Sequence, residues 1–407
     1  MQKNFILVIN CGSSSLKFSL INPVSSETIL TGLAEQLFSN EASIKIKLEN
    51  KVIEKPIYAP HTHDIAIELL VEQLDCLGYQ EQIFAIGHRI VHGGEKYSEP
   101  TLISHEVKKT IDELSRLAPL HNPANLTGIE ACEKVFKNLP QVAVFDTAFH
   151  QTIPSKAFIY GLPYELYEEH AIRRYGFHGT SHYFVANQAA KLISKPIESC
   201  NFISAHLGNG CSVTAIKKGK SIDTSLGFTP NEGVMMGTRS GDVDSGIIFY
   251  LVNQLGYSID EVNKTVNSKS GLLGVSGMSN DCRTLEEAMT GEPNCRATLA
   301  LTVFSYRVAK MIASYTAALT DLDGIIFTGG IGENSMYVRS LILSHLTLLN
   351  LAVDEDKNKQ ARFGNTGNIT TDSSRACWVI PTNEEFVIAQ QTQILLSSNS
   401  SSKTEGQ

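Results

Sequence analysis

The stretch Asn10-Cys11-Gly12-Ser13-Ser14-Ser15-Leu16-Lys17 decides the fold, since it stands between two short apolar runs, 5–9 and 16–21. The pattern predicts a strand, a tight turn of small residues and a second strand. A turn of this composition offers backbone N–H groups, hydroxyls, an amide and one cation, which suit phosphate oxygens and a hydrated cation. Gly-Ser-Ser-Ser is also ordinary hairpin composition, so a purely structural turn is the alternative that the remaining sequence must decide.

The first half of the chain is predicted to begin as an antiparallel meander and to continue as α/β units. Closely spaced strand patterns come first and then alternate with helical periodicity. The expected strands are 5–9, 16–21, 29–37, 42–48, 83–86 and 142–145, and the expected helices are 65–77, 107–117 and 125–136.

The same order of strands and helices recurs after about residue 150. Strands are expected at 202–205, 212–216, 221–224, 325–327 and 378–380, with helices after 245, at 297–319 and from 384 to about 396. Because 407 residues exceed one hydrophobic core, two α/β domains are predicted. Their expected bounds are 1–150, completed by the C-terminal helix 385–396, and 151–384, followed by a flexible tail at 397–407.

Composition argues against nucleic-acid and membrane partners. The formal net charge is −8 and the cationic residues are dispersed. Eight cysteines occur without Cys-x-x-Cys pairs, which favours a reducing cytoplasm. The N-terminus lacks the pattern of a signal peptide, and the apolar helix at 297–319 carries Arg307 and Lys310, so no membrane span is expected.

Four further loops follow predicted strands and carry polar groups. The segment 204–210 repeats the strand–turn–strand pattern of 10–17, with small polar residues in the turn. The glycine-rich segment 328–334 precedes a helix whose N-terminus favours phosphate. The segment 328–334 contains no G-x-G-x-x-G and no G-x-x-x-x-G-K-[ST], which disfavours a Rossmann site and a Walker P-loop. Arg89 and Arg239 stand among small residues, where a guanidinium can reach carboxylate or phosphoryl oxygens; a surface ion pair is the alternative.

These motifs closely resemble those of the acetate kinases. The strings in family order are VINCGSSSLKFSL, GHRIVHGGE, PLHNP, VFDTAFH, YGFHGTSH, SAHLGNG, EGVMMGTRSGDVD, FTGGIGEN and PTNEE, from about residue 4 to about 394, with small departures such as Cys11 and Cys211. The resemblance implies the fold shared by acetate and sugar kinases, Hsp70 and actin: two duplicated actin-like (ribonuclease H-like) α/β domains, with the nucleotide in the cleft between them. It also implies a homodimer.

The resemblance further implies a reversible, Mg²⁺-dependent transfer of the ATP γ-phosphoryl group to acetate, giving acetyl phosphate and ADP, with Mn²⁺ as an alternative ion. It assigns roles to single residues. These are Asn10 and Glu384 for the metal; Lys17, Asp146, His178 and Arg239 for catalysis; Arg89, Val91, His121 and Pro230 for the substrate; and Ser13, Ser15, His206, Leu207, Gly208, Asn209, Gly210, Asp281, Cys282, Arg283, Gly329, Gly330, Ile331, Gly332 and Glu333 for the nucleotide.

Elementary chemistry agrees with this reaction. A short carboxylic acid has a pKa of about 4.3, like Glu, and is already ionised at neutral pH, so no general base is required. The obstacle is repulsion between two anions, which Mg²⁺ and cationic side chains reduce. Direct in-line transfer is therefore expected, with Asp146 orienting an arginine or the hydrated ion. A phosphorylated carboxylate such as Glu384 is the alternative.

The sequence leaves three alternative activities: a zinc hydrolase, an ATP-driven switch and a propionate kinase. The pairs His88/His92 and His178/His182 have the spacing of zinc ligands, but no Glu follows the first His, and His182 is expected to be structural. A non-catalytic ATP-driven switch is compatible with the same fold, since fold does not decide function. A propionate kinase differs from an acetate kinase by one methylene of substrate, worth only about 1–3 kcal/mol.

Overall fold

The computed structural model describes residues 3–119, 121–290 and 295–404. The chain divides into two compact units, Met1–Ala148 with Asn383–Gln407, and Phe149–Thr382. The C-terminal segment therefore returns to the first unit, and it takes Glu384 with it rather than leaving that residue in the second.

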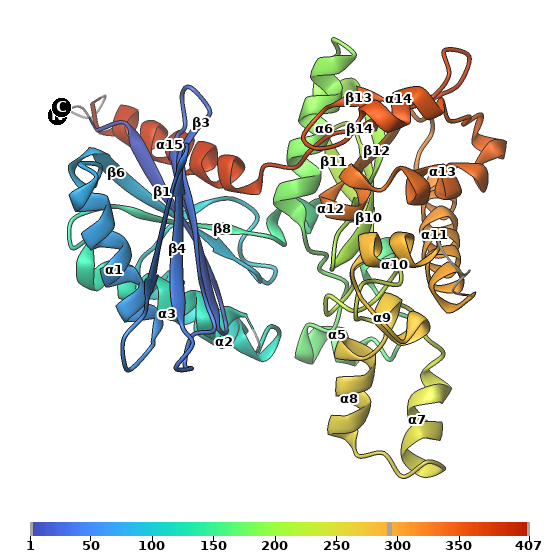
Figure 1. Ribbon diagram of the computed structural model, residues 1–407, viewed down its shortest axis with the longest axis horizontal. Coiled ribbons are helices and arrows are strands. Elements are labelled where there is room, and N and C mark those ends of the chain that lie inside the picture. The colour runs from blue at the N-terminus through green and yellow to red at the C-terminus, as the bar shows by residue number, and fades with distance from the viewer. Residues whose placement is uncertain (1–2, 120, 291–294, 405–407) are drawn as a thin grey trace. The chain divides into compact units, whose positions relative to one another are not determined.

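The first unit is a mixed sheet with helices on both faces (Figure 1). Its strands are β1 (Phe5–Gly12), β2 (Ser15–Asn22), β3 (Glu27–Glu35), β4 (Ser43–Leu48), β5 (Lys51–Pro56), β6 (Ile83–Ile90), β7 (Thr101–Leu102) and β8 (Gln141–Phe145), and its helices are α1 (His63–Cys76), α2 (His105–Glu113), α3 (Asn122–Val135) and α15 (Glu384–Thr404). The strand order is β5-β4-β3-β2-β1-β6-β8-β7. Strands β1 to β4 form the expected antiparallel meander, which β5 extends, and β1, β6 and β8 run parallel.

Strand β1 is buried on both faces because its alternate side chains pack under different helices. Leu7 and Ile9 belong to the apolar cluster that includes residues of α1 and α3. Ile6 and Val8 point the other way and pack with Ile388 of α15. The sequence of β1 is therefore a continuous apolar run, and helix α15 covers one of its two faces.

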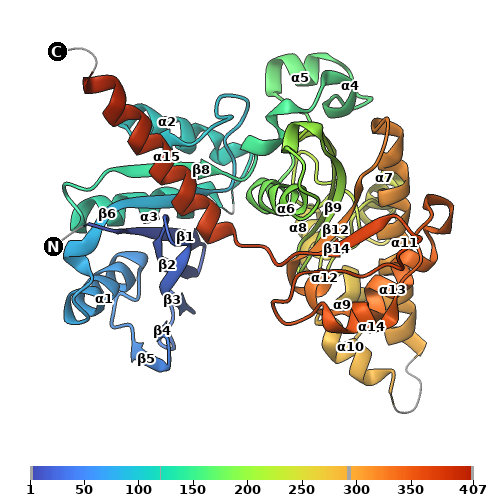
Figure 2. The same cartoon turned by 90° about the horizontal axis from the view of Figure 1, so that it is seen from above.

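The second unit is built around a similar hairpin (Figure 2). Its strands are β9 (Asn201–Leu207), β10 (Cys211–Lys217), β11 (Lys220–Thr224), β12 (Gly324–Thr328), β13 (Gly367–Asn368) and β14 (Ala376–Val379). Its helices are α4 (Ser155–Phe158), α5 (Glu165–His170), α6 (Gly179–Leu192), α7 (Ser245–Asn253), α8 (Ile259–Ser268), α9 (Gly271–Ser276), α10 (Cys282–Ala288), α11 (Cys295–Tyr315), α12 (Gly329–Asn334), α13 (Met336–Ser344) and α14 (Glu355–Gln360).

The sheet of the second unit has the order β11-β10-β9-β12-β14-β13. Strands β9 and β10 pair antiparallel, as β1 and β2 do, while β12 is parallel to β9 and β14. Helix α6 packs on one face, with Val185 and Ala189 against Phe202 and Ile326, and α11 lies on the opposite face (Figures 1 and 2). The mixed α/β architecture predicted for both halves is confirmed.

The structure corrects several expected boundaries. Strands β1 and β2 extend so far that only Ser13 and Ser14 form the turn, because backbone pairing continues through Asn10 and Lys17. Strand β6 likewise continues through Arg89 to Ile90, and the short strands β5, β7 and β13 were not expected. Helix α15 runs to Thr404, so the expected tail is helical over 397–404, and residues 405–407 lie outside the described residues.

Candidate active site

In the first unit, the predicted site residues gather at one edge of the sheet. Asn10 lies near the end of β1, Arg89 lies near the end of β6, and Asp146 directly follows β8. The carboxyl ends of parallel strands meet at the same edge, which explains why residues so distant in sequence come together. The backbone N–H of Asp146 donates to the carbonyl of Ile90 (2.9 Å), which fixes the start of the loop after β8.

Arg89 and Asp146 form a bidentate ion pair. Arg89 Nε lies 3.1 Å from Asp146 Oδ1, and Arg89 Nη2 lies 2.5 Å from Asp146 Oδ2. The third guanidinium nitrogen, Nη1, donates to Oδ1 of Asn10 at 3.4 Å. Asp146 is buried and Arg89 is mostly buried, so this pair is shielded from water and its planar geometry fixes the guanidinium. The alternative of a surface ion pair is therefore wrong for Arg89.

The charges around this pair explain its pKa shifts. Burial alone would lower the pKa of Arg89, but the carboxylates of Asp146, Glu384 and Glu385 outweigh burial, and the pKa is raised. Burial raises the pKa of Asp146, while Arg89 and His121 oppose that rise. The arginine is thus held charged, and both carboxylate oxygens of Asp146 contact its guanidinium.

The remaining predicted residues of the first unit surround this pair. Lys17 on β2 forms a salt bridge with Glu385 (Nζ–Oε1 2.7 Å), and Glu384 is the first residue of α15. Ser13 lies in the turn and Ser15 begins β2. Buried Val91 donates its N–H to Asn125, and His121 is the N-cap of α3.

The oxygens near Arg89 form a donor set that suits a hard divalent cation. The amide oxygen of Asn10 contacts Arg89, and the carboxylate of Glu384 lies close enough to shift the pKa of both Arg89 and Asp146. Neutral and anionic oxygens, completed by water and phosphate, are the ligands that Mg²⁺ prefers. The residues present therefore fit such an ion.

In the second unit, two predicted catalytic side chains converge beside Gly210, in the turn between β9 and β10. A Cβ at Gly210 would lie 3.3 Å from Arg239 Nη1 and 3.5 Å from His178 Nε2. Both nitrogens carry or can carry hydrogen-bond donors, so together they offer a site for an anionic oxygen. The glycine leaves that approach open.

His178 is oriented by the elements around it. It is the N-cap of α6 in a left-handed conformation (φ +57°), and its Nδ1 lies 2.9 Å from Ser212 Oγ on β10. Its ring stacks on His206, with centroids 4.3 Å apart, and His206 Nδ1 lies 2.8 Å from Ser181 Oγ. Two neighbouring imidazoles are thus fixed in position from their Nδ1 sides.

Arg239 is held by neutral groups. Its Nη1 donates to the carbonyl of Pro230 at 3.0 Å and lies 3.9 Å from the sulfur of Met236. Burial lowers its pKa. The loop carrying it is anchored where Gly237 donates its N–H to the carbonyl of Asn209 (3.0 Å); a Cβ at Gly237 would lie only 2.1 Å from the side-chain oxygen of Asn209.

A cavity of about 610 Å³ lies next to the β9–β10 turn and is large enough for part of a nucleotide. It brings together seven of the fifteen residues predicted to bind nucleotide and adds others that the sequence did not single out. Its described lining is Gly208, Asn209, Asn280, Asp281, Cys282, Arg283, Glu286, Gly330, Ile331, Asn334, Ser335, Arg362 and Phe363.

Sequence reasoning missed Arg362 and Phe363 of this cavity, together with Asn280, Glu286 and Ser335. Phe363 is 79% exposed, and its ring lies 4.7 Å from the guanidinium carbon of Arg362. Arg362 Nε is buried and finds no hydrogen-bond partner among the described residues. Only the tripeptide Arg362-Phe363-Gly364, an arginine and an aromatic ring beside a glycine, was available as a signal in the sequence.

The glycine-rich segment after β12 differs from its prediction in one respect. It begins α12 at once, but the carboxylate of Glu333 accepts the N–H of Gly329 (2.9 Å) and the N–H of Thr382 (3.1 Å). The N–H of Gly329 is therefore already satisfied by protein and is not presented to phosphate. Leu207 ends β9 and Gly332 is buried within α12, so both shape the backbone rather than line the cavity.

In each histidine pair, at least one ring makes hydrogen bonds to neighbouring side chains. His88 Nε2 bonds to Gln141 (2.6 Å), and His182 bonds to Ser204 and Ser212 through its two nitrogens (2.7 Å each). Within residues 3–119, 121–290 and 295–404, no three His, Cys, Asp or Glu side chains are grouped as metal ligands. His182 is fully buried, which agrees with the structural role predicted for it.

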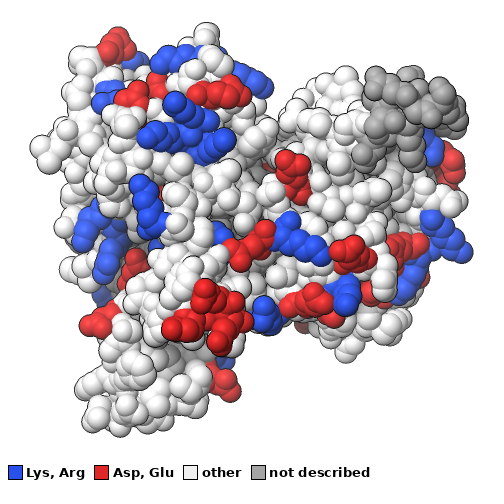
Figure 3. Space-filling view, turned by 180° about the vertical axis from the view of Figure 1, so that it is seen from behind, with Lys and Arg blue, Asp and Glu red and all other residues white. Residues whose placement is uncertain are grey.

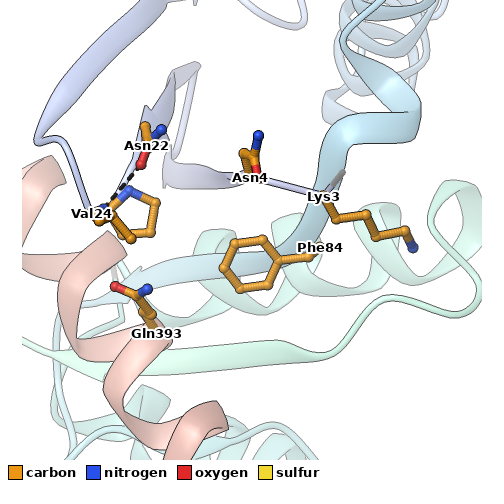
Figure 4. A pocket seen from close by; sticks show the side chains of 7 residues that line it. Lys3, Asn4, Asn22, Val24, Phe84 and Gln393 are labelled. Carbon is orange, nitrogen blue, oxygen red and sulfur yellow. Dashed lines mark hydrogen bonds between the residues drawn. The ribbon is translucent and has the colours of Figure 1, made fainter. Parts of the chain in front are cut away.

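A second hollow, of about 430 Å³, lies in the first unit between β1, β2, β6 and α15 (Figure 4). Its lining is mainly amide and apolar, with Phe84 and Gln393 facing Asn22, whose Oδ1 accepts the N–H of Val24 at 3.0 Å. None of the predicted site residues is among its described lining residues. This hollow is therefore separate from the predicted active-site residues.

The surface carries both signs of charge. Figure 3 shows lysines and arginines interspersed with acidic residues over the face it draws. Across the described part of the chain, no helix combines the length and apolar character needed to cross a membrane.

Comparison with known proteins places these features in a family. A model of the acetokinase family matches residues 5–390. An acetate kinase of Shewanella woodyi is 54% identical over 400 residues, covering 97% of this chain and all of that protein. One from Shewanella oneidensis is 53% identical over 400 residues, with 98% and 100% coverage.

Solved structures similar to this chain also include acetate and propionate kinases. An acetate kinase of Porphyromonas gingivalis has a TM-score of 0.91 at 42% identity, covering 97% of this chain and 100% of that one. A propionate kinase of Francisella tularensis has a TM-score of 0.90 at 46% identity, covering 95% and 98%. The fold is thus the actin-like fold of these kinases, and the chain belongs to the acetokinase family.

Proposed function

We propose that this protein is a phosphotransferase that moves the γ-phosphoryl group of ATP reversibly to acetate, giving acetyl phosphate and ADP. The observation that carries the proposal is the convergence of Arg239 Nη1 and His178 Nε2 beside Gly210. Two donors aimed at one point suit the charge that spreads over the phosphoryl oxygens in an in-line displacement. Membership of the acetokinase family supports acetate as the acceptor.

Arg89 is proposed to bind the carboxylate of acetate, with Val91, His121 and Pro230 lining the substrate end. Acetate is already ionised at neutral pH, so its oxygen attacks phosphorus directly and no residue must remove a proton. The bidentate pair with Arg89 gives Asp146 an orienting role. This reading disfavours a phosphorylated Glu384 as an intermediate, because direct attack needs no second transfer.

Asn10 and Glu384 are proposed to hold Mg²⁺, with Mn²⁺ as an alternative ion. When bound, the ion supplies positive charge to the phosphate oxygens. Lys17 is proposed to act near the transferred group, with Ser13 and Ser15 beside it; its salt bridge with Glu385 would restrain its ammonium group there.

The adenosine part of ATP is proposed to occupy the 610 Å³ cavity of the second unit, between Asp281–Arg283 and Gly330–Ile331. His206, Leu207 and Gly208–Gly210 would carry the phosphates towards His178 and Arg239, with Gly329, Gly332 and Glu333 supporting the backbone. Both units are proposed to be actin-like domains, the second being the nucleotide-binding one.

Propionate is the second candidate acceptor, because a propionate kinase is among the similar structures. The test is kcat/KM for acetate, propionate and butyrate with Mg·ATP, with the acyl phosphate trapped as hydroxamate. Highest kcat/KM with acetate supports the proposal, whereas highest kcat/KM with propionate selects the alternative. ATP turnover that is indifferent to every carboxylate would point to a conformational switch instead.

A cytoplasmic homodimer is also proposed. Buried free thiols such as Cys11, Cys211 and Cys377 suit a reducing compartment. Helix α7 exposes Phe249 (65%) and Tyr250 (58%), an apolar surface of the kind that partners cover. Phe249→Glu should shift the mass in light scattering from dimer to monomer, and an unchanged mass would place any interface elsewhere.

A further inference from the structure

The proposed reaction needs a proton on one particular atom of His178. Its Nε2 lies beside Arg239 Nη1 at Gly210, where an anionic oxygen would be bound. A neutral imidazole carries its proton on either nitrogen, and only the Nε2–H form can donate there. The other form would present a lone pair to an anion. Something must therefore select the tautomer.

Ser212 Oγ stands between two imidazoles. It lies 2.9 Å from His178 Nδ1 and 2.7 Å from His182 Nε2, and it is fully buried on β10. A hydroxyl has one proton to donate, so it can donate to only one ring and must accept from the other. The proton positions of the two histidines are consequently coupled.

The chain of hydrogen bonds continues beyond His182. His182 Nδ1 lies 2.7 Å from Ser204 Oγ on β9, a residue that is also fully buried. Burial lowers the pKa of His182 well below its ordinary value, and the nearby His150 and His206 act in the same direction. His182 is therefore neutral, with one nitrogen that donates and one that accepts.

We propose that Ser212 is a positioning residue that keeps the proton of His178 on Nε2, through a directed chain Ser204–His182–Ser212–His178. Ser204 donates to His182 Nδ1, His182 Nε2–H donates to Ser212, and Ser212 donates to His178 Nδ1. Arg239 and the stacked ring of His206 are titratable or charged groups that lie beside His178. The direction of this chain rests on the proposed function, which needs the Nε2 proton, whereas the tautomer itself can be measured in the free protein.

The decisive experiment compares Ser212→Ala with Thr214→Val. Thr214 lies on the same strand and the same face, is equally buried, and loses one hydroxyl contact, to Thr224 (2.8 Å), without touching a histidine. Imidazole ¹⁵N shifts of His178 and His182 are measured in the full-length protein at a pH of about 8, above the ordinary imidazole pKa of about 6.5. The native protein and Thr214→Val should show both rings as Nε2–H, and Ser212→Ala a mixture of tautomers at His178.

Kinetics give the second readout. Ser212→Ala should lower kcat by about 10²-fold, as expected for a misplaced catalytic group. Its KM values for ATP and acetate should stay within about threefold, because binding contacts are retained. A single Nε2–H signal for His178 in Ser212→Ala, or equal kcat losses in both variants, would overturn the inference. Normal turnover in His178→Ala would instead reject the proposed function, whatever the tautomer.

Discussion

The two site arginines are held in opposite ways. Arg89 is locked into a bidentate pair with a buried carboxylate, which raises its pKa. Arg239 contacts a carbonyl and a thioether, and burial lowers its pKa; in the described part of the chain no carboxylate lies within salt-bridge distance of it. The charge of Arg89 is balanced by Asp146 before any ligand binds. The charge of Arg239 has lost contact with water through burial, and a bound anion would compensate that loss. Arg89 is therefore suited to orienting a small substrate, and Arg239 to stabilising charge that develops during reaction.

Arg239→Ala tests this contrast with the largest expected effect. Removing an uncompensated guanidinium from the transferring phosphoryl group should lower kcat by about 10³-fold or more. KM for acetate should change little, since the interaction is strongest in the transition state. Arg239→Lys, which keeps the charge but not the planar fork, should recover part of the rate. A large rise in KM with normal kcat would show that Arg239 only binds ground-state substrate.

Arg89→Ala should affect affinity and rate together. The carboxylate of acetate would lose its partner, and Asp146 would be left buried without its cation. We expect kcat/KM for acetate to fall by about 10²-fold, shared between KM and kcat. Because the orphaned carboxylate destabilises the fold of Arg89→Ala, the double variant Arg89→Ala/Asp146→Asn serves as the control for folding. Unchanged KM for acetate would remove Arg89 from the substrate site.

Asp146→Asn separates orientation from proton transfer. The substitution keeps the shape of the side chain and one acceptor for Arg89 but removes the charge. If Asp146 only orients the guanidinium, kcat should fall by about 10-fold through loosened geometry, and the pH dependence of the remaining rate should match that of the native protein. Loss of an acidic limb from the profile would instead identify Asp146 as a base.

The comparison of the two arginines also shows which features could be predicted from the sequence. The meander, the α/β alternation and the two arginines were predictable, because strand periodicity and family strings are local features of the chain. The ion pair between Arg89 and Asp146 joins residues 57 positions apart in the sequence and depends on the parallel register of β6 and β8. The carboxylate of Glu333 at Gly329, and Ser212 between two histidines, likewise depend on which strands pair, which no local pattern encodes.

Substitution of Phe363 should give the smallest effect, and it tests the 610 Å³ cavity rather than the arginines. Its exposed ring lines the same cavity as Asp281 and Ile331, so it can cover a nucleobase that enters there. An aromatic contact of about 0.5–1.5 kcal/mol corresponds to a rise of about 2- to 12-fold in KM for ATP in Phe363→Ala. Phe363→Tyr, which keeps the ring, is the matched control and should behave like the native protein. Since the proposed catalytic groups lie beside Gly210, kcat should stay unchanged in both variants; a fall in kcat with constant KM would contradict a role confined to the nucleobase.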